Sequence, residues 1–509
     1  MKAIPYLLAL VLLLSACSKA PPVQTPQTDA VAITLTDNMI TVDGQTVGTD
    51  RTAAVYTAND IVYYESGKDF TYGEGTQKDA HPAELAAAHT VVHIAQPGTY
   101  RVSGKLSQGQ IAVDLGDKAK EDPDAVVTLI LDGVDITCQV APAVIFYNVY
   151  ECGSDAPETA SKDVDTSAAG ANVMIADGTV NTVNGAYVER IYKPDSVILN
   201  ADKTKVEDAD KLHKYDGAFY SKRSMNIFGG TENTGILNIN AENEGLDSEM
   251  HLTIHGGNIH ITSGNDGINT NEDGISVTTV NGGNLTIRVT GETGEGDGID
   301  SNGWLVINGG TVTTAACSRS ADAGIDSDMG IHITGGTVIA TGHMLDRIES
   351  GGQNYAVFNF AQEQSGSETV TLQDPEGNPL LEAAPENAYS ILIVSSPDLK
   401  AGTYTLWSGS KQLLGSSGGM EGRPGMRPGN PGAFQRPEDG KHPEGDNRPD
   451  GFTPPEGFIP PEGGNRPERP EESRPEHPNN NTAPAQELSP QFPIRDGGNT
   501  FSNIRISEN

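Results

Sequence analysis

Leu252-Thr-Ile-His-Gly-Gly-Asn-Ile-His-Ile-Thr262 is one copy of a unit that recurs through the middle of the chain. In each unit two short, alternating apolar segments flank a pair of glycines, and successive pairs lie 27, 26, 27 and 26 residues apart. Alternation with period two predicts strands with one buried face, and a fixed repeat of this length is typical of a solenoid whose units stack. The pairs are Gly229-Gly230, Gly256-Gly257, Gly282-Gly283, Gly309-Gly310 and Gly335-Gly336.

The repeat therefore predicts an all-β fold, a right-handed parallel β-helix of about 26–27 residues per coil. Ile254, Ile307 and Ile333 should stack in one inward column, with Val280 taking the same place in the irregular third coil. Polar substitution in such a column would bury an unpaired charge, so the column is a direct test of the fold.

An acidic loop precedes each of the later glycine pairs. An apolar residue in the middle of each loop should point inward, so we expect the flanking carboxylates to point outward, stacked at about 4.8 Å. Like charges at this distance repel, and Ca²⁺, which takes about six to eight oxygen ligands, would remove the repulsion. The loops are Glu244-Gly-Leu-Asp247, Asp266-Gly-Ile-Asn269, Asp297-Gly-Ile-Asp300 and Asp322-Ala-Gly-Ile-Asp326, with a more distant copy beginning at Asp216.

These loops supply the candidate metal ligands. The alternative is that Asp-Gly only forms tight turns, because Asp tolerates and Gly favours left-handed geometry. Four aligned loops, each with a second oxygen-bearing residue, favour calcium binding, although the spacing differs from the nonapeptide calcium repeat and the EF-hand loop. The expected ligands are Glu244, Asp247, Asp266, Asn269, Asp297, Asp300 and Asp326, with Asp216, Asp273, Asp322 and Asp328 as further candidates.

The chain is strongly acidic, with 69 Asp plus Glu against 33 Lys plus Arg and a formal net charge of -36. Nucleic acid is excluded as a partner, because its phosphates need a basic surface. Direct attraction to an acidic polymer is opposed as well, unless bound cations invert the local sign of the charge.

The N-terminus is typical of an export signal. Lys2 is followed by the apolar run Leu7 to Leu14 and then by Ser15-Ala-Cys17. A run of this length is too short to span a membrane. Leu14-Ser-Ala-Cys17 resembles a bacterial lipobox, which predicts a signal peptide over residues 1–16, lipidation of Cys17 and an extracytoplasmic protein anchored to the cell membrane. A plain secretory signal is the alternative.

Composition and the pattern of apolar residues divide the rest of the chain into segments. We expect a lipid-anchored tether over 17–30, an N-terminal β flank over 31–89, the β-helix over 90–345 and a small β cap over 346–414. Residues 415–495 are rich in Gly, Pro and Glu, which predicts disorder, and 496–509 alternates again as a possible returning strand. A disulfide between Cys138 and Cys152 is geometrically possible in an oxidising compartment; small buried side chains are the alternative.

Four stretches resemble a family of bacterial lipoproteins described as carbohydrate-binding domain-containing. The resemblance covers roughly residues 90 to 345 and implies a calcium-binding β-helix, similar in fold to pectate lyases, that attaches to plant cell-wall polysaccharides such as cellulose or polygalacturonate. Lyase activity is not what the resemblance implies. The stretches are Ile136 to Asn148, Ile239 to Asp247, Asn265 to Gly274 and Gly296 to Ser301.

Three functions remain open. A non-catalytic, calcium-loaded polysaccharide-binding lipoprotein is favoured, because repetition along a solenoid adds weak contacts along a polymer. A pectate-type lyase would need a cationic base beside the metal, and the candidates are Lys222, Arg223, Arg288 and Arg319. A surface adhesin or scaffold with a protein partner differs from the first only in what is bound.

Overall fold

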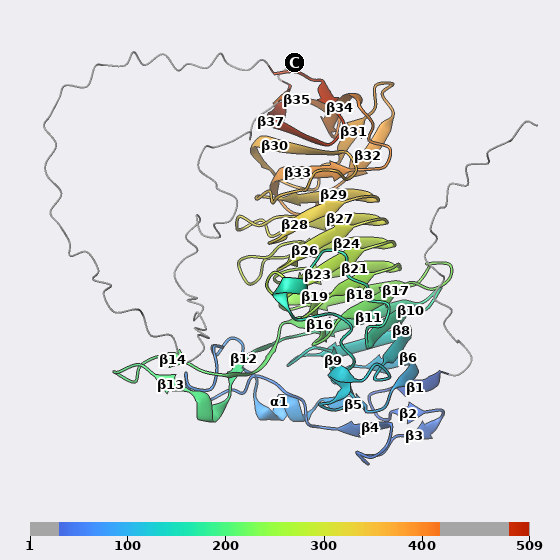
Figure 1. Cartoon of the computed structure of the whole chain (residues 1–509), viewed down its shortest axis with the longest axis vertical. Helices are drawn as coiled ribbons and strands as arrows, with labels where there is room; N and C mark the ends of the chain where they lie inside the picture. Colours follow the sequence, from blue (N-terminus) through green and yellow to red (C-terminus); the bar gives the residue numbers. More distant parts are fainter. Residues whose placement is uncertain (1–29, 418–487, 508–509) are drawn as a thin grey trace, which may run out of the picture.

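In the computed structural model, which describes residues 30–417 and 488–507, strands stack as parallel rungs along one long axis (Figure 1). Nearly every element is a β-strand, and the successive repeats pair in parallel, so the prediction of an all-β chain with large parallel sheets is confirmed. Within the described ranges no helix is long and apolar enough to cross a membrane.

Each complete repeat contributes one strand to each of three columns. The first column holds β6 (Gly98–Leu106), β8 (Val127–Cys138), β10 (Ala171–Ile175), β17 (Met225–Phe228), β20 (Leu252–Ile254), β23 (Val277–Val280), β26 (Trp304–Ile307) and β28 (Gly330–Ile333). The second column shares β8 and holds β11 (Val180–Gly185), β18 (Ile236–Ala241), β21 (Asn258–Ser263), β24 (Asn284–Val289), β27 (Thr311–Ala315) and β29 (Thr337–Gly342).

The third column is a separate sheet that carries the acidic loops. Its parallel strands are β5 (Thr90–Ile94), β7 (Gly109–Asp114), β9 (Val144–Asn148), β16 (Gly217–Ser221), β19 (Glu244–Ser248), β22 (Ile268–Thr270) and β25 (Ile299–Ser301), and β4 (Val55–Ala58) joins β5 antiparallel. Buried side chains from all three columns belong to one apolar core.

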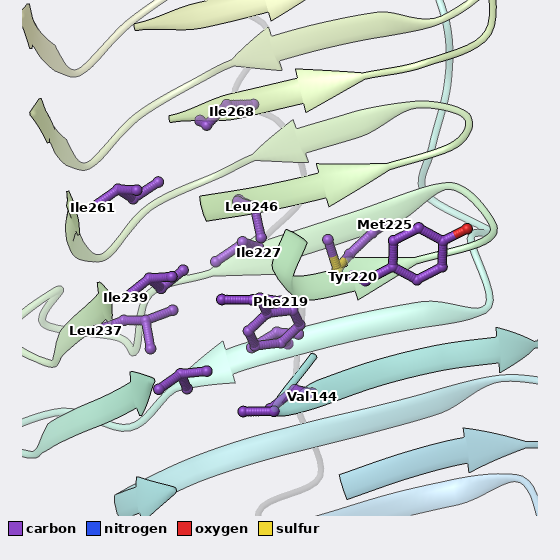
Figure 2. Packing of buried hydrophobic residues seen from close by; sticks show 14 of the residues in the cluster. Val144, Phe219, Tyr220, Met225, Ile227, Leu237, Ile239, Leu246, Ile261 and Ile268 are labelled. Carbon is purple, nitrogen blue, oxygen red and sulfur yellow. The ribbon is translucent and has the colours of Figure 1, made fainter. Parts of the chain in front are cut away.

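The predicted apolar column is present. Ile254 pairs with Val280, Val280 with Ile307 and Ile307 with Ile333, and all four are at most 1% exposed. In the third column Leu246 and Ile268 pair in the same way, and Figure 2 shows both among the packed interior side chains. Register between repeats is therefore set by apolar residues that recur at the same place in each unit.

The glycine pairs form the turns between the first and second columns. A Cβ on Gly309 would lie 2.5 Å from the carbonyl oxygen of Asn281 in the preceding repeat, and Gly310 has φ +78°. The first glycine thus allows two turns to approach closely, and the second adopts a left-handed conformation that other residues rarely take.

Antiparallel strands close the C-terminal end of the stack. β33 (Tyr389–Ser395) pairs with β29, and β30 (Tyr355–Gln364) pairs with β33 on its other side. The alternating stretch near the C-terminus is β37 (Gly498–Ile506), which lies between β30 and β35 (Lys411–Ser417). The unit has its own apolar core, and the edge of the last parallel strand is covered.

The remaining strands lie at the two ends of the stack and in one insert. At the N-terminal end β1 (Val31–Leu35) pairs in parallel with β6, and the short α1 (Ala83–Ala87) precedes β5. The closing unit also contains β31 (Val370–Gln373), β32 (Pro379–Ala383), β34 (Gly402–Ser408) and β36 (Phe492–Ile494). Residues 189–214 form a projecting insert built on β12 (Val188–Tyr192) and β15 (Lys211–Tyr215), which pair antiparallel (Figure 1).

Candidate metal centre

The acidic loops stack in register at the third column. Asp247 of β19 pairs with Asn269 of β22, and Asn269 pairs with Asp300 of β25. Backbone bonds fix the residues just before them, since Gly245 N–H donates to the carbonyl oxygen of Asp266 and Gly267 N–H donates to that of Asp297, both over 3.0 Å. Oxygen-bearing side chains from three successive repeats therefore lie in one line.

Three carboxylates form the first acidic cluster: Asp216, Glu244 and Asp247. One carboxylate oxygen from each lies within 4.8 Å of the other two. All three residues are buried, with Asp247 fully inaccessible and Glu244 4% exposed. The sequence did not predict this burial, to which Lys214 of the insert contributes through its ion pair with Asp216.

Hydrogen bonding leaves part of the first cluster unsatisfied. Asn269 Nδ2 donates to Glu244 Oε1 over 3.2 Å, and Asn271 Nδ2 donates to Asp247 Oδ1 over 2.7 Å. Glu244 Oε2, Asp247 Oδ2 and Asn269 Oδ1 are buried and accept no hydrogen bond from the residues that the structure describes. Buried oxygens without partners are costly, and carboxylate and amide oxygens are the ligands that hard divalent cations take.

Burial and mutual repulsion disfavour ionisation in this cluster. The pKa of Glu244 is raised well above its ordinary value by burial and by the charges of Asp216 and Asp266. Burial likewise raises the pKa of Asp247, with Glu244 and Glu249 adding to the effect. Three ionised carboxylates at this separation need compensating positive charge to remain buried.

Lys214 supplies one such charge, and the sequence analysis missed it. Its Nζ forms an ion pair with Asp216 Oδ2. Burial lowers the pKa of the ammonium, but Asp216 and Glu244 outweigh that effect and raise it. The sequence could have indicated this ion pair, because Lys214 lies only two residues before Asp216 in the chain.

The second acidic cluster contains Asp297, Asp300 and Asp326, whose oxygens also lie within 4.8 Å of one another. These residues are half-buried. Burial raises the pKa of Asp326 to about 8, with the charges of Asp346, Asp300 and Asp328 adding to it. The pKa of Asp297 is raised well above its ordinary value, by burial first and by Asp326 next. This cluster is the more accessible of the two.

Some acidic residues also hold the rungs together. Asp266 Oδ1 accepts a hydrogen bond from the backbone N–H of Asp297 over 2.6 Å, and Asp297 Oδ1 accepts one from Ala323 N–H over 2.5 Å. Asp266 is 8% exposed and lies between the two clusters, where burial and the charges of Asp300 and Asp297 raise its pKa. The same loops thus supply both the hydrogen bonds between rungs and the carboxylates that could hold a cation.

Three further candidates lie outside both clusters. Asp322 Oδ2 accepts hydrogen bonds from Gly296 N–H, over 2.8 Å, and from the hydroxyl of Ser320. Asp273 is exposed and accepts a bond from Asn302 Nδ2 over 3.0 Å. Asp328 is exposed too. The structure does not group these three with the buried oxygens.

Two of the four candidate bases form contacts elsewhere in the structure. Arg288 pairs with Glu386 at 3.3 Å, and Arg319 Nη1 donates to the carbonyl oxygen of Gly291 over 2.8 Å. Lys222 is exposed, and Arg223 is half-buried. In their place the structure puts Lys214 beside the carboxylates.

Of the two alternatives for Cys138 and Cys152, the structure has the unbridged thiols. Cys138 and Cys152 are both free thiols, as is Cys317. Cys138 is 2% exposed within the apolar core, where a small thiol packs as a hydrophobic side chain. The lipidation predicted at Cys17 and most of the segment 415–495 lie outside the described residues.

Comparison with known proteins gives a family match over the rungs just described. The model of the family described as carbohydrate-binding domain-containing protein matches residues 88–153 and 158–369. A carbohydrate-binding domain-containing protein of Acetivibrio thermocellus is 29% identical over 179 residues, which cover 35% of this chain. Those residues span only 46% of that relative.

A solved structure of a polysaccharide lyase-like protein from C. thermocellum, a gadolinium derivative, is also similar. It is 18% identical, with a TM-score of 0.33, over 60% of this chain and 84% of that chain.

Proposed function

Because the chain belongs to the family of carbohydrate-binding domain-containing proteins, we propose that it binds an anionic polysaccharide through calcium held in its two acidic clusters, without cleaving it. The observation that carries the proposal is the set of buried oxygens without partners on Glu244, Asp247 and Asn269. Family membership supports a carbohydrate ligand, and the oxygen chemistry supports the cation.

The donor set fits calcium. Asp216, Glu244, Asp247 and Asn269 would hold one ion, and Asp297, Asp300 and Asp326 would hold another. Bound there, Ca²⁺ supplies positive charge that keeps the carboxylates ionised and attracts carboxylates of the polymer. The half-buried second cluster is the better candidate for contact with a polysaccharide, whereas the first cluster, closed by Lys214, stabilises the stack.

The architecture supports an extended binding surface. We propose that the three columns wind as a right-handed parallel β-helix, in keeping with the handedness of parallel strand connections. Equivalent side chains then recur once per rung, at about 4.8 Å, along the length of the molecule. A polymer can make one weak contact per rung, and the contacts act together.

The polysaccharide we propose is of the plant cell-wall type, cellulose or a pectin such as polygalacturonate, and calcium favours the uronate polymer. We also propose that the protein is an extracytoplasmic lipoprotein anchored to the cell membrane through Cys17. Both proposals rest on the sequence.

A calcium-dependent lyase is the second candidate, and Lys214 is the observation in its favour. A base must lose its proton to act, however, and the raised pKa of Lys214 keeps the ammonium protonated at neutral pH. Binding without cleavage is therefore the better-supported function.

Retention on insoluble polygalacturonate and cellulose, with calcium or with EDTA, tests the proposal. We expect retention on polygalacturonate that EDTA abolishes, and no unsaturated uronate by absorbance after long incubation. Product that disappears in a Lys214→Ala variant but persists in Lys222→Ala would establish the lyase instead.

A further inference from the structure

A cavity of about 660 Å³ lies between residues 61–72 and the insert 189–214. Its walls come from the segment ahead of α1 and from β12, β15 and the turn after β12. None of the predicted metal ligands lines it. A volume in this range is typical of small-molecule sites.

The cavity is held open by bonds between segments far apart in the sequence. Gly73 forms a β-bridge with Ile191, and the backbone N–H of Tyr192 donates to the carbonyl oxygen of Tyr72 over 2.9 Å. Arg190 Nη1 forms an ion pair with Glu74 Oε2 at 2.8 Å. Because these contacts need no ligand, the site is formed in advance.

One part of the lining is aromatic and apolar. Tyr63, Tyr72 and Tyr192 line the cavity and are half-buried. Leu212 lines it as well, although its side chain is 50% exposed. Phe70, on the first wall between two lining residues, is 47% exposed. Rings with an accessible face offer a surface for the C–H face of a sugar ring.

Another part of the lining is polar, with one lysine, Lys68, beside two carboxylates, Glu65 and Asp69. Lys68 pairs with Glu65 at 2.9 Å, and its ammonium lies 5.2 Å from the ring centroid of Tyr72. His213 Nδ1 bonds the hydroxyl of Tyr215 over 2.7 Å, and Nε2 has no hydrogen bond within the described residues. Donors and acceptors side by side suit hydroxyl groups, which both donate and accept, better than they suit a net charge.

We propose that this cavity is a second saccharide site, which takes a neutral pyranose unit of a polysaccharide and needs no metal. The ligand class rests on the proposed carbohydrate function, but the site is independent of calcium. His213 and Lys214 are neighbours on β15, and since side chains alternate along a strand, one serves the cavity while the other pairs with Asp216. A single strand thus places the neutral site next to the first acidic cluster.

The test uses the full-length protein and cellotetraose, a neutral glucose tetramer. We expect cellotetraose to bind by calorimetry equally in calcium and in EDTA, and to slow hydrogen exchange in residues 61–72 and 189–214. Tyr192→Ala and His213→Ala should each weaken binding about tenfold. Tyr150→Ala, a half-buried tyrosine outside the cavity, should leave it unchanged.

Retention on polygalacturonate, measured in the same variants, separates this proposal from the previous one. Retention of the Tyr192→Ala variant should still be abolished by EDTA. If EDTA does not abolish retention of this variant or of the wild type, the result counts against calcium-dependent polysaccharide binding and leaves the saccharide site untouched. Absence of cellotetraose binding, or equal affinity in Tyr192→Ala, His213→Ala and Tyr150→Ala, would overturn the saccharide site. An apolar peptide that protects 61–72 where cellotetraose does not would reassign the cavity to a protein partner.

Discussion

Asp247 and Asn269 lie directly opposite each other on neighbouring parallel strands, and each has a buried side-chain oxygen that accepts no hydrogen bond within residues 30–417 and 488–507. The core of the stack is a continuous cluster of apolar side chains, and beside it this line of oxygens departs from the rule that buried polar groups are satisfied. A cation bound between these strands would coordinate the unpaired oxygens, so it should stabilise the fold.

Calcium should raise the melting temperature of the wild-type protein by several degrees. At a free concentration one hundred times the dissociation constant, binding adds about 2.7 kcal/mol to the free energy of unfolding. A Glu244→Gln, Asp247→Asn double variant should lose most of this rise, yet melt higher than wild type in EDTA, because buried charge has been removed. Differential scanning calorimetry measures both. Equal wild-type curves in EDTA and millimolar calcium would contradict the metal site.

Without a cation, stability should fall as pH rises. Burial raises the pKa of Asp326 from 3.8 to about 8, so the folded state binds this proton more tightly than the unfolded state does. Its contribution to stability is complete below about pH 4 and is lost as pH rises through about 8. Urea denaturation in EDTA at pH 5, 7 and 9 measures this loss. Calcium should make the free energy of unfolding less dependent on pH, because the cation compensates the ionised carboxylates. The Asp326→Asn variant should also show a weaker pH dependence, because its side chain does not titrate.

The second cluster should link calcium affinity to polymer binding. Asp297→Asn combined with Asp300→Asn removes two of the three carboxylates, so calcium affinity and retention on polygalacturonate should fall together, each by at least tenfold. Asp273→Asn is the control, because Asp273 is exposed and outside the clusters. Retention unchanged while calcium affinity falls would place the polymer elsewhere.

Ile307→Asp should prevent stable folding. Ile307 is fully buried between Val280 and Ile333, and an unpaired charge there should cost more than about 4 kcal/mol. Ile307→Val, which removes one methylene, should cost about 0.5–1.5 kcal/mol. Urea midpoints and resistance to proteolysis distinguish the two variants.

Gly309→Ala should destabilise the stack although the added group is a single methyl. The new Cβ would meet the carbonyl oxygen of Asn281 at 2.5 Å, so neighbouring turns must move apart. Gly48→Ala is the matched control, since nothing lies within 4 Å of a Cβ at that position. We expect a cost of about 1–3 kcal/mol for the first change and almost none for the second.

The sequence predicted the rungs because one signal repeats. Glycine pairs and alternating apolar residues recur at nearly constant spacing, so the pairing of Val280 between Ile254 and Ile307 followed from counting alone. Burial of the acidic loops could not be predicted in this way. It depends on chain outside the repeat, including Lys214, and no periodicity places such an insert against a given rung.

The cavity could not be predicted from the sequence for the same reason. Tyr72 and Tyr192 are far apart in the sequence and neither belongs to a repeat, so their backbone hydrogen bond and the bridge between Gly73 and Ile191 could not be predicted from periodicity. The repeat predicts sugar-binding residues along the regular face of the stack, whereas this cavity lies where the repeat is interrupted.

Closure of the stack by β33 has a consequence for how such a chain changes in length. Both ends are made from segments that are not repeats: β4 and β1 at one end, and β33 with its neighbours at the other. Between β18 and β29 each strand of the second column pairs with the strands of the neighbouring rungs in the same register. Duplication or deletion of one whole unit therefore leaves both ends intact and alters only the number of rungs, and with it the reach of the molecule.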